Sequence, residues 1–564
     1  MDRFWQAAYP AGIPGDITEE MQQYSSLNEL FLQSCNRFGS STAYVNMGAQ
    51  LSYQRLQQQS EHFAGWLQTQ GIGKGDRIAL MMPNLLQYPV CLFGALLVGA
   101  VVVNVNPLYT ADELHHQLAD SQARLIVVAE NFAHTVEKAM PGTALECIVL
   151  TRIGDFLGPI KGGLINLVLK HVRRQIPAYS LPGAHNLPAL LRATHPFQAV
   201  DLSHNDLAFL QYTGGTTGRA KGAMLSHGNI VANVCQAHAW VRQHLFEGRE
   251  TVITALPLYH IFALTANCLM FLRLGARNVL ITNPRDIPQF VKTLSRYPYS
   301  TLTGVNTLFN ALLNNPEFSK TSFDTLKVTL GGGMAVQAAV AERWYATTGK
   351  VITQAYGLTE TSPAATINPL GNHPFNGSVG LPISSTDIAL FDDQGRRLPD
   401  TETGEVGIKG PQVTLGYWNQ PEETAELFTA EGYLRTGDIG RFDAQGYLYL
   451  LDRKKDMIVV SGFNVYPNEV EAVAVQLEGV REAAAVGIPD PHSGEVVKLF
   501  VIANDPALTE RHVIEHCREH LTRYKVPRQV EFRSDLPRSN VGKILRRALR
   551  EEAAHPRADV KKPR

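Results

Sequence analysis

The hydrophobic pattern of roughly the first 450 residues alternates between short apolar runs and longer amphipathic segments. Apolar runs at 77–82, 101–105 and 125–129 indicate buried strands, and the segments at 88–99 and 111–121 between them have helical spacing. Such alternation is typical of largely parallel sheets covered by helices. We therefore predict an α/β fold with layered sheets and helices for this part of the chain.

The pattern changes near residue 452. Beyond it, strands are predicted at 457–461, 482–486, 496–502 and 529–532, and helices at 468–477 and 510–521. Short strands packed with two helices are typical of a small α+β domain. We predict a large N-terminal domain over residues 1–451 and a small, mobile C-terminal domain over residues 452–564.

Two segments raise the question of membrane contact. Residues 78–111 carry no charge, but Pro83, Pro89 and Pro107 interrupt them, whereas a spanning helix needs about 20 uninterrupted apolar residues. Residues 161–176 form an amphipathic helix with Leu164, Ile165, Val168, Leu169, Val172 and Ile176 on one face and Lys170, Arg173 and Arg174 on the other. This helix either packs on its own domain with a solvated basic face, the commoner case, or lies on an anionic membrane.

Composition narrows the class of protein. The formal net charge of −1 provides no global field that would recruit nucleic acid. The six cysteines include no Cys-x-x-Cys pair, which is typical of reduced thiols in the cytoplasm. The N-terminus lacks a signal-peptide core. We predict a cytoplasmic protein without a nucleic-acid partner.

The segment 212–222, Tyr-Thr-Gly-Gly-Thr-Thr-Gly-Arg-Ala-Lys-Gly, carries the strongest chemical signal. Its glycines allow the backbone to approach a ligand closely, and its N–H groups, hydroxyls and cations suit an anion. It is not a Walker A loop, because Lys221 is followed by Gly222 and not by a hydroxyl residue. A ligand with phosphate groups, such as a nucleotide, is the first inference.

Further motifs follow in a fixed order. They are Pro257-Leu-Tyr-His260, Gly331-Gly-Gly333, Tyr356-Gly-Leu-Thr-Glu360, Gly404-Glu-Val-Gly-Ile-Lys-Gly410, Tyr433-Leu-Arg-Thr-Gly-Asp438, Asp452-Arg453 and Gly542-Lys543. This series resembles the acyl-adenylate-forming (AMP-binding) superfamily over nearly the whole chain. Residues 431–459, 81–89 and 103–109 are most similar to those of fatty acyl-CoA synthetases, in particular bacterial long-chain fatty acid–CoA ligases.

The resemblance implies a two-step reaction that consumes ATP. A fatty acid carboxylate attacks the α-phosphorus to give acyl-AMP and pyrophosphate, and the thiol of CoA then displaces AMP. Activation as a mixed anhydride supplies the leaving group that a free carboxylate lacks. A CoA ligase for medium-chain or aryl carboxylic acids remains an alternative, because no short motif encodes the acyl chain-length range or the residues that line an acyl tunnel.

The resemblance also implies roles for individual residues. The β- and γ-phosphates would be bound by Thr213, Gly214, Gly215, Thr216, Thr217, Gly218 and Lys221. The adenine and the α-phosphate would lie against Gly331, Gly332, Gly333, Tyr356, Gly357 and Thr359. Asp438 would accept hydrogen bonds from the ribose hydroxyls, supported by Arg453.

Four residues are the expected catalytic set: Lys543, His260, Thr359 and Glu360. Glu360 would bind Mg²⁺, because a hard cation that bridges phosphates prefers carboxylate oxygen. His260 would lie near the attacking carboxylate. Lys543 would offset the negative charge of the transition state.

Motion of the C-terminal domain is also implied. Asp452 occupies the expected hinge, since a few residues at the end of an element can absorb a large backbone rotation. After adenylation, the motif Ser461, Gly462, Phe463 and Asn464 would move to the active site and bind CoA. The expected partners are fatty acid, ATP, CoA and Mg²⁺. Peripheral contact with the inner membrane and a homodimer are further options that the sequence leaves open.

Other classes of protein explain the motifs less well. A non-catalytic nucleotide-binding regulator has no use for a lysine at position 543, and a nonribosomal adenylation domain would precede a carrier-protein segment, which we do not expect here. A hydrolase would need a Gly-x-Ser-x-Gly elbow, which the sequence lacks. His516 and His520 have the spacing of a helical metal pair but no carboxylate-rich surroundings.

Overall fold

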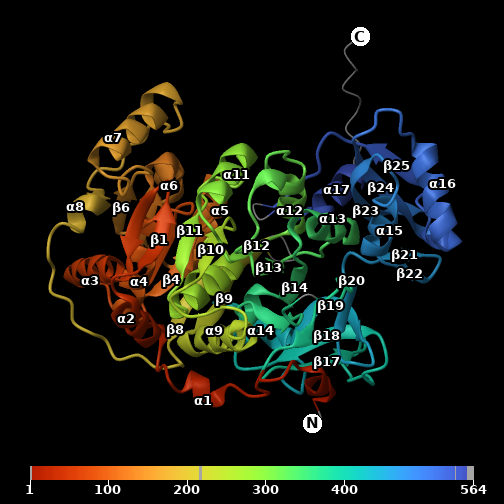
Figure 1. Cartoon of the computed structure of the whole chain (residues 1–564), viewed down its shortest axis with the longest axis horizontal. Helices are drawn as coiled ribbons and strands as arrows, with labels where there is room; N and C mark the ends of the chain where they lie inside the picture. Colours follow the sequence, from red (N-terminus) through yellow and green to blue (C-terminus); the bar gives the residue numbers. More distant parts are fainter. Residues whose placement is uncertain (1–2, 215–218, 372, 540–541, 555–564) are drawn as a thin grey trace.

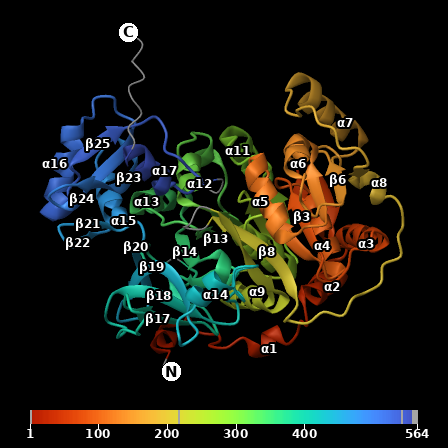
Figure 2. The same cartoon turned by 180° about the vertical axis from the view of Figure 1, so that it is seen from behind.

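The computed structural model describes residues 3–214, 219–371, 373–539 and 542–554. Figures 1 and 2 show two helix-covered sheets side by side, an antiparallel sheet beneath them, and a smaller unit at the C-terminal end. This arrangement confirms the predicted α/β fold with a large N-terminal part and a small α+β domain. No helix among these described residues is long and apolar enough to cross a membrane.

The first large sheet has the described order β7-β6-β5-β3-β4-β8-β9. Its strands are β3 (Arg77–Met81), β4 (Val101–Asn104), β5 (Leu125–Ala129), β6 (Cys147–Thr151), β7 (His185–Asn186), β8 (Leu207–Gly214) and β9 (Ala220–Ser226). All neighbours run parallel except β8 and β9, which are antiparallel. Residues 212–214 and 220–222 of the segment that the sequence presented as a loop therefore lie on the paired strands β8 and β9, with Lys221 on β9.

The second large sheet has the described order β16-β15-β14-β13-β12-β10-β11-β1-β2. Its strands are β1 (Thr42–Asn46), β2 (Ala49–Ser52), β10 (Thr251–Thr254), β11 (Arg277–Leu280), β12 (Thr301–Gly304), β13 (Val328–Gly331), β14 (Ile352–Gly357), β15 (Ala364–Ile367) and β16 (Leu381–Pro382). The central pairs are parallel, so the carboxyl ends of β13 and β14 lie at the same edge. That edge brings the motifs at 331–333 and 356–360 together.

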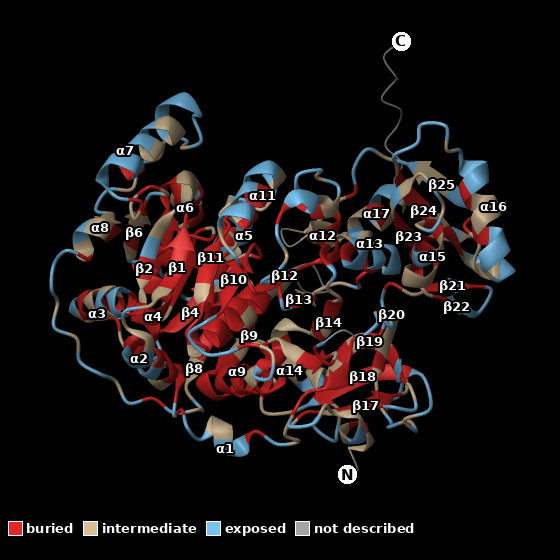
Figure 3. Ribbon diagram, viewed as in Figure 1, coloured by how far each residue is buried: buried red, intermediate tan, exposed pale blue. Residues whose placement is uncertain are grey.

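Helices cover both sheets, and their interiors are buried (Figure 3). The helices of the N-terminal part are α1 (Thr18–Met21), α2 (Leu27–Phe38), α3 (Tyr53–Thr69), α4 (Gln87–Leu97), α5 (Ala111–Ser121), α6 (Ala133–Ala139), α7 (Pro159–Leu167), α8 (Leu187–Leu190), α9 (His227–Val241), α10 (Met270–Arg273), α11 (Ile287–Arg296), α12 (Asn306–Leu313), α13 (Ala338–Thr348) and α14 (Pro421–Leu427). The uncharged stretch 78–111 forms β3, α4 and β4, as its prolines indicated.

A third, antiparallel sheet leads to the C-terminal part. It contains β17 (Asp387–Phe391), β18 (Gly404–Lys409), β19 (Leu434–Phe442) and β20 (Leu448–Arg453). The C-terminal sheet contains β21 (Ile458–Val460), β22 (Phe463–Val465), β23 (Val480–Asp490), β24 (Gly494–Ala503) and β25 (Gln529–Phe532). It packs with α15 (Pro467–Ala474), α16 (Glu510–His520) and α17 (Arg546–Ala554). The sequence pattern missed β22 and α17.

Candidate active site

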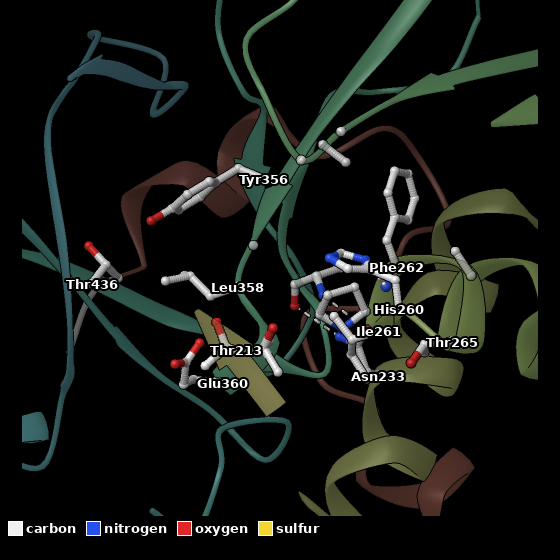
Figure 4. A pocket seen from close by; sticks show the side chains of 18 of the residues that line it. Thr213, Asn233, His260, Ile261, Phe262, Thr265, Tyr356, Leu358, Glu360 and Thr436 are labelled. Carbon is white, nitrogen blue, oxygen red and sulfur yellow. Dashed lines mark hydrogen bonds between the residues drawn. The ribbon is translucent and has the colours of Figure 1, made fainter. Parts of the chain in front are cut away.

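A cavity of about 450 Å³ opens where the large sheets, the antiparallel sheet and the C-terminal domain meet. This volume is typical of a small-molecule site. Figure 4 shows Thr213 and Glu360 on one side of the cavity and Phe262 and Thr265 on the other. The lining therefore joins a polar end, built at the carboxyl edges of strands, to an apolar end between helices.

Three residues from two sheets form a hydrogen-bonded group beside the cavity. The Tyr356 hydroxyl, at the end of β14, donates to Oδ2 of Asp438 at 2.6 Å. Arg453 lies opposite Asp438 in the β19–β20 pairing, and its Nε is 2.8 Å from Oδ1. Burial raises the pKa of Tyr356 and the adjacent Asp438 charge adds to this effect, so the phenol is a donor and Asp438 an acceptor.

Glu360 and Lys221 face the same part of the cavity from different elements. Glu360 lies on the 3₁₀ turn η6 (Thr359–Thr361), is 8% exposed, and accepts a 2.6 Å hydrogen bond at Oε1 from Tyr417. Lys221 on β9 forms an ion pair with Glu423 and lies over the Tyr417 ring. Burial lowers the pKa of Lys221, while the Glu360 and Glu426 charges oppose that shift.

Lys543 enters the cavity from the C-terminal domain. A side chain built at Gly333 would lie 3.7 Å from Cε of Lys543, so the lysine passes beside the glycine motif. Burial lowers the pKa of Lys543 to about 8, with a further contribution from the Arg453 charge, and Asp438 and Glu360 act in the opposite direction. Residues more than 300 positions apart in the sequence thus converge on one cavity.

His260 lines the cavity where η4 (Ala263–Leu269) begins. Burial, with a smaller effect of Lys543, lowers the pKa of His260 to about 3, so the imidazole is neutral at physiological pH. Its Nδ1 accepts a hydrogen bond from the Phe262 amide at 3.3 Å. This contact leaves the proton on Nε2, so His260 can donate a hydrogen bond at that atom.

The glycines of the predicted motifs are needed for different structural reasons. Gly332 and Gly333 line the cavity, whereas Gly331 packs beneath it, where a Cβ would lie 2.8 Å from the Ile352 side chain. At Gly357 a Cβ would lie only 1.7 Å from the Pro363 carbonyl oxygen. Thr213, Gly357 and Thr359 also line the cavity. Gly215, Thr216, Thr217 and Gly218 lie outside the described residues, and Gly214 ends β8.

The apolar end of the cavity was not predicted from the sequence. Along α9 and the turn after it, the lining residues recur every four positions, at Asn233, Ala237, Val241 and Leu245. A second series with the same interval, Phe262, Ala266 and Met270, lines it from η4 and α10. Residues at this interval share one side of a helix. From Asn233 to Val241 the lining extends ~12 Å along α9, so the apolar end is a channel that follows this helix.

Comparison with protein-family models decides the family. The model described as AMP-binding enzyme matches residues 31–418, and that described as AMP-binding enzyme C-terminal domain matches residues 469–543. The chain belongs to the AMP-binding enzyme family.

Curated relatives of this AMP-binding enzyme cover it almost completely. It is 54% identical over 557 residues to a long-chain-fatty-acid–CoA ligase of Salmonella typhimurium, which spans 98% of this chain and 99% of that protein. It is 35% identical over 555 residues to a long-chain-fatty-acid–CoA ligase of Bacillus subtilis, with 97% and 98% covered.

Solved structures of the family share the fold. The anthranilate CoA ligase AuaEII in complex with anthranoyl-AMP superposes with a TM-score of 0.84 at 25% identity, covering 94% of this chain and 97% of that one. ATP-bound MatB from Rhodopseudomonas palustris has a TM-score of 0.82 at 27% identity, covering 94% and 99%. The similarity extends over both the large and the small domain.

The remaining predicted residues lie outside the cavity lining. Ser461 and Gly462 form the turn between β21 and β22, and Phe463 and Asn464 begin β22. All four are exposed on the surface of the small domain, where Phe463 stacks on Tyr524. Asp452 is buried at the end of β20, accepts a hydrogen bond from the Asn468 amide and lies 3.7 Å from Arg546. Burial raises the pKa of Asp452 to about 6, and the Arg546 charge counters this.

The histidine pair in the small domain has other partners. His516 contacts the Val473 carbonyl, and His520 contacts the His516 carbonyl. Within the described part of the chain, no group of three or more His, Cys, Asp or Glu side chains is placed to hold a metal ion. The helical metal-pair hypothesis therefore receives no support from the geometry.

Proposed function

We propose that this AMP-binding enzyme is a long-chain fatty acid–CoA ligase. It consumes ATP, forms acyl-AMP with release of pyrophosphate, and transfers the acyl group to CoA with release of AMP. Two curated relatives that match nearly the full chain carry the name long-chain-fatty-acid–CoA ligase. The cavity supports the same substrate, because its charged end leads into an apolar channel between two helices.

The observation that carries this proposal is the convergence of Lys543, Lys221 and Glu360 at the mouth of an apolar channel. Two cations suit the phosphates and the carboxylate of the substrates, and the channel suits a hydrocarbon chain. Asp438 and Tyr356 would hold the ribose and adenine beside them. A nucleotide-binding regulator would need neither the channel nor a buried lysine from a second domain.

Magnesium fits this donor set only together with the nucleotide. Glu360 is the carboxylate that faces the cavity beside Lys221, and one of its oxygens is already engaged by Tyr417. Mg²⁺ is commonly held by one or two carboxylates plus substrate phosphates. Glu360 would thus hold the ion against ATP, and the bound ion would neutralise phosphate charge.

The residues of the chain perform the positioning steps. Neutral His260 donates a hydrogen bond from Nε2 toward the carboxylate and holds its oxygen near the α-phosphorus. Lys543 supplies positive charge where the carboxylate and α-phosphate meet, so it stabilises charge that grows in the transition state. Lys221 exchanges its partner Glu423 for the outer phosphates when ATP binds. The new C–O–P linkage forms as the bond from the α-phosphorus to pyrophosphate breaks.

Separate assays of the two half-reactions test the proposal. We expect Lys543→Ala to lower acyl-AMP formation by roughly 10²–10³, the usual cost of losing one aligned charge-stabilising group. The same variant should still convert preformed acyl-AMP and CoA to thioester. Lys498→Ala, which removes a lysine paired with Glu531 elsewhere in the small domain, is the matched control. Equal loss in both half-reactions of Lys543→Ala would contradict the assignment.

The cellular setting follows from the substrate. We place the enzyme in the cytoplasm, in peripheral contact with the inner membrane, because long-chain fatty acids partition into lipid. Acyl-CoA formation there would feed fatty acid degradation. A homodimer is compatible with this function, and light scattering of the purified protein measures the oligomeric state directly.

A further inference from the structure

An exposed apolar stripe runs along the helical segment at the edge of the first large sheet. The segment comprises α7 (Pro159–Leu167) and the π-helix η3 (Val168–Val172), and it stands clear of the neighbouring helices in Figures 1 and 3. The exposed fractions are 88% for Ile160, 62% for Leu164, 55% for Leu167 and 70% for Val172. Exposed large apolar side chains that gather on one side mark an interaction surface.

The opposite side of α7 is fixed to the protein. At Gly162 a Cβ would lie 2.0 Å from the Gly154 carbonyl oxygen, so two backbones pack directly on each other there. Asn166 accepts a hydrogen bond from the Gly154 amide and donates one to Asp155. Because Gly162 and Asn166 face inward, the residues across the helix must face outward.

The π-helix extends the stripe by one more residue. In a regular α-helix, Val172 would lie about 140° around the axis from Leu167. The amide of Arg173 instead donates to the Val168 carbonyl at 2.8 Å, which is the i→i+5 pattern of a wider turn. Such turns bring residue i+5 back to nearly the same side. Leu164 and Val172 are exposed, whereas Ile165, Val168 and Leu169, which the sequence pattern predicted on the same face, are half-buried.

Positive charge surrounds the stripe. Residues 156–200 contain five Lys or Arg residues and no Asp or Glu, in a chain whose formal net charge is −1. Two of these cations are exposed but have partners in the protein: Lys161 donates to the Met47 carbonyl, and Lys170 lies 3.9 Å from buried Glu130. Arg173 and Arg174 are exposed, and neither forms an ion pair with a described residue. They are available to an external anionic partner.

We propose that this stripe, Ile160, Leu164, Leu167 and Val172, docks on the surface of an anionic lipid bilayer with Arg173 and Arg174 at the headgroups. An apolar face flanked by Lys or Arg is the combination that holds a helix in the plane of a bilayer. A second copy of the chain would present the same cationic patch, and a two-fold contact would bring like charges together. The inference rests on the proposed peripheral membrane contact but not on the ligase chemistry.

Vesicle sedimentation with the full-length protein tests this surface without ATP or fatty acid. We expect the wild type to bind phosphatidylglycerol–phosphatidylethanolamine vesicles better than phosphatidylcholine vesicles, and less well at about 0.5 M salt. The quadruple variant Ile160→Gln, Leu164→Gln, Leu167→Gln and Val172→Gln should lose at least about tenfold in partition coefficient. Arg173→Glu with Arg174→Glu should lower binding to anionic vesicles only.

The control variants distinguish binding of the stripe to a bilayer from binding to a second copy of the chain. Phe246→Gln, Tyr345→Gln and Phe532→Gln remove exposed apolar side chains elsewhere on the surface and should leave vesicle binding unchanged. Unchanged thermal unfolding and unchanged adenylation of a detergent-dispersed acid show that the quadruple variant is folded. The proposal is overturned if that variant binds vesicles like the wild type, or if it converts a dimer to a monomer without altering vesicle binding.

Discussion

At the scale of single residues, burial changes the pKa values of the groups at the polar end of the cavity. The carboxylates of Asp438 and Glu360 raise the pKa of Lys543 and the Arg453 cation lowers it, but burial has the largest effect and the pKa is lowered. His260 beside it is held neutral. A titration near neutral pH should therefore report Lys543 and not the histidine.

The pH dependence of adenylation follows from that state. The lowered pKa of Lys543, about 8, means that its ammonium is present below pH 8 and is lost as the pH rises through that value. Because kcat/KM reports the free enzyme, we expect kcat/KM for acyl-AMP formation to fall above about pH 8. The arginine of Lys543→Arg keeps its charge at all accessible pH values, so kcat/KM of this variant should show no such fall. The variant should be slower overall, because a guanidinium differs in shape from an ammonium group. A fall of the same shape in Lys543→Arg would assign the titration to another group.

Tyr417 is a positioning residue that the motifs did not indicate. Its hydroxyl donates to Oε1 of Glu360, and this fixes the carboxylate proposed to bind magnesium. We expect Tyr417→Phe to raise the Mg²⁺ concentration needed for half-maximal adenylation by roughly 3- to 10-fold, since one charge-assisted hydrogen bond is lost. The rate at saturating Mg²⁺ should change less.

A matched control for Tyr417 exists on the far side of the large domain. Tyr179→Phe also removes a phenol that donates to a carboxylate, that of Glu130 at 2.9 Å, but away from the cavity. It should leave the Mg²⁺ requirement unchanged. If Tyr417→Phe lowers the saturating rate without shifting the Mg²⁺ titration, Tyr417 acts on the reaction by another route than Glu360.

At the scale of elements, the channel depends on two helices whose lining residues recur every four positions. The channel begins near Asn233, whose amide donates to the Ala364 carbonyl, and continues past Ala237 and Val241 toward Leu245. Small and branched side chains on α9 leave the space that Phe262 and Met270 border from the other side. Chain-length selection should therefore be set along α9.

Substitutions along α9 should shorten the range of accepted acids in order. We expect Ala237→Phe to exclude long chains while adenylation of short acids is retained, because the added ring blocks the channel near its mouth. Val241→Phe, one turn further along, should block only longer chains. AMP release measured across saturated acids of increasing length gives both profiles. Identical profiles for the two variants, or loss of activity with every acid despite normal thermal unfolding, would contradict this path.

The sequence predicted some elements well and missed others for identifiable reasons. The strand at 125–129 and the helix at 111–121 occur as expected, since their hydrophobic periods are clear. Strand β9 (Ala220–Ser226) was missed because its glycine and lysine resemble a loop. The lining face of α9 could not be predicted, because this helix is buried on nearly all sides and carries no amphipathic signal.

The candidate site was predictable where a motif lies at the end of a strand. Tyr356 and Glu360 lie at and just after the end of β14, and the pairing of β19 with β20 places Asp438 opposite Arg453. The hydrogen bond from Tyr356 to Asp438 then joins the two sheets beside the cavity. Tyr417 and Glu423 carry no motif, and only the path of the chain after β18 brings them to Glu360 and Lys221. Such contacts depend on tertiary packing, which a single sequence does not display.

At the scale of the whole molecule, we infer that the small domain takes different orientations in the two half-reactions. Lys543 lies in the cavity, whereas residues 461–464, at the turn between β21 and β22, are exposed on the surface of the same domain. If this turn binds CoA, the domain must rotate between the steps and withdraw the lysine. The domain boundary at residue 452 remains a prediction. Asp452 lies near the end of β20, just before the first strand of the small domain.

A proline at the hinge tests this rotation. Proline fixes its own φ and restricts the residue before it, so Asp452→Pro should hinder rotation about the hinge. We expect thioester formation from preformed acyl-AMP to fall by about 10² while adenylation falls less, since hinge changes act through motion rather than through the site.

Asp452→Ala also loses the contacts to Asn468 and Arg546 but leaves the backbone free, so it should retain both half-reactions. If the alanine variant loses thioester formation as strongly as the proline variant, the carboxylate itself is required and the hinge explanation fails. Unchanged rates in both halves for the proline variant would mean that the domain does not turn about this residue.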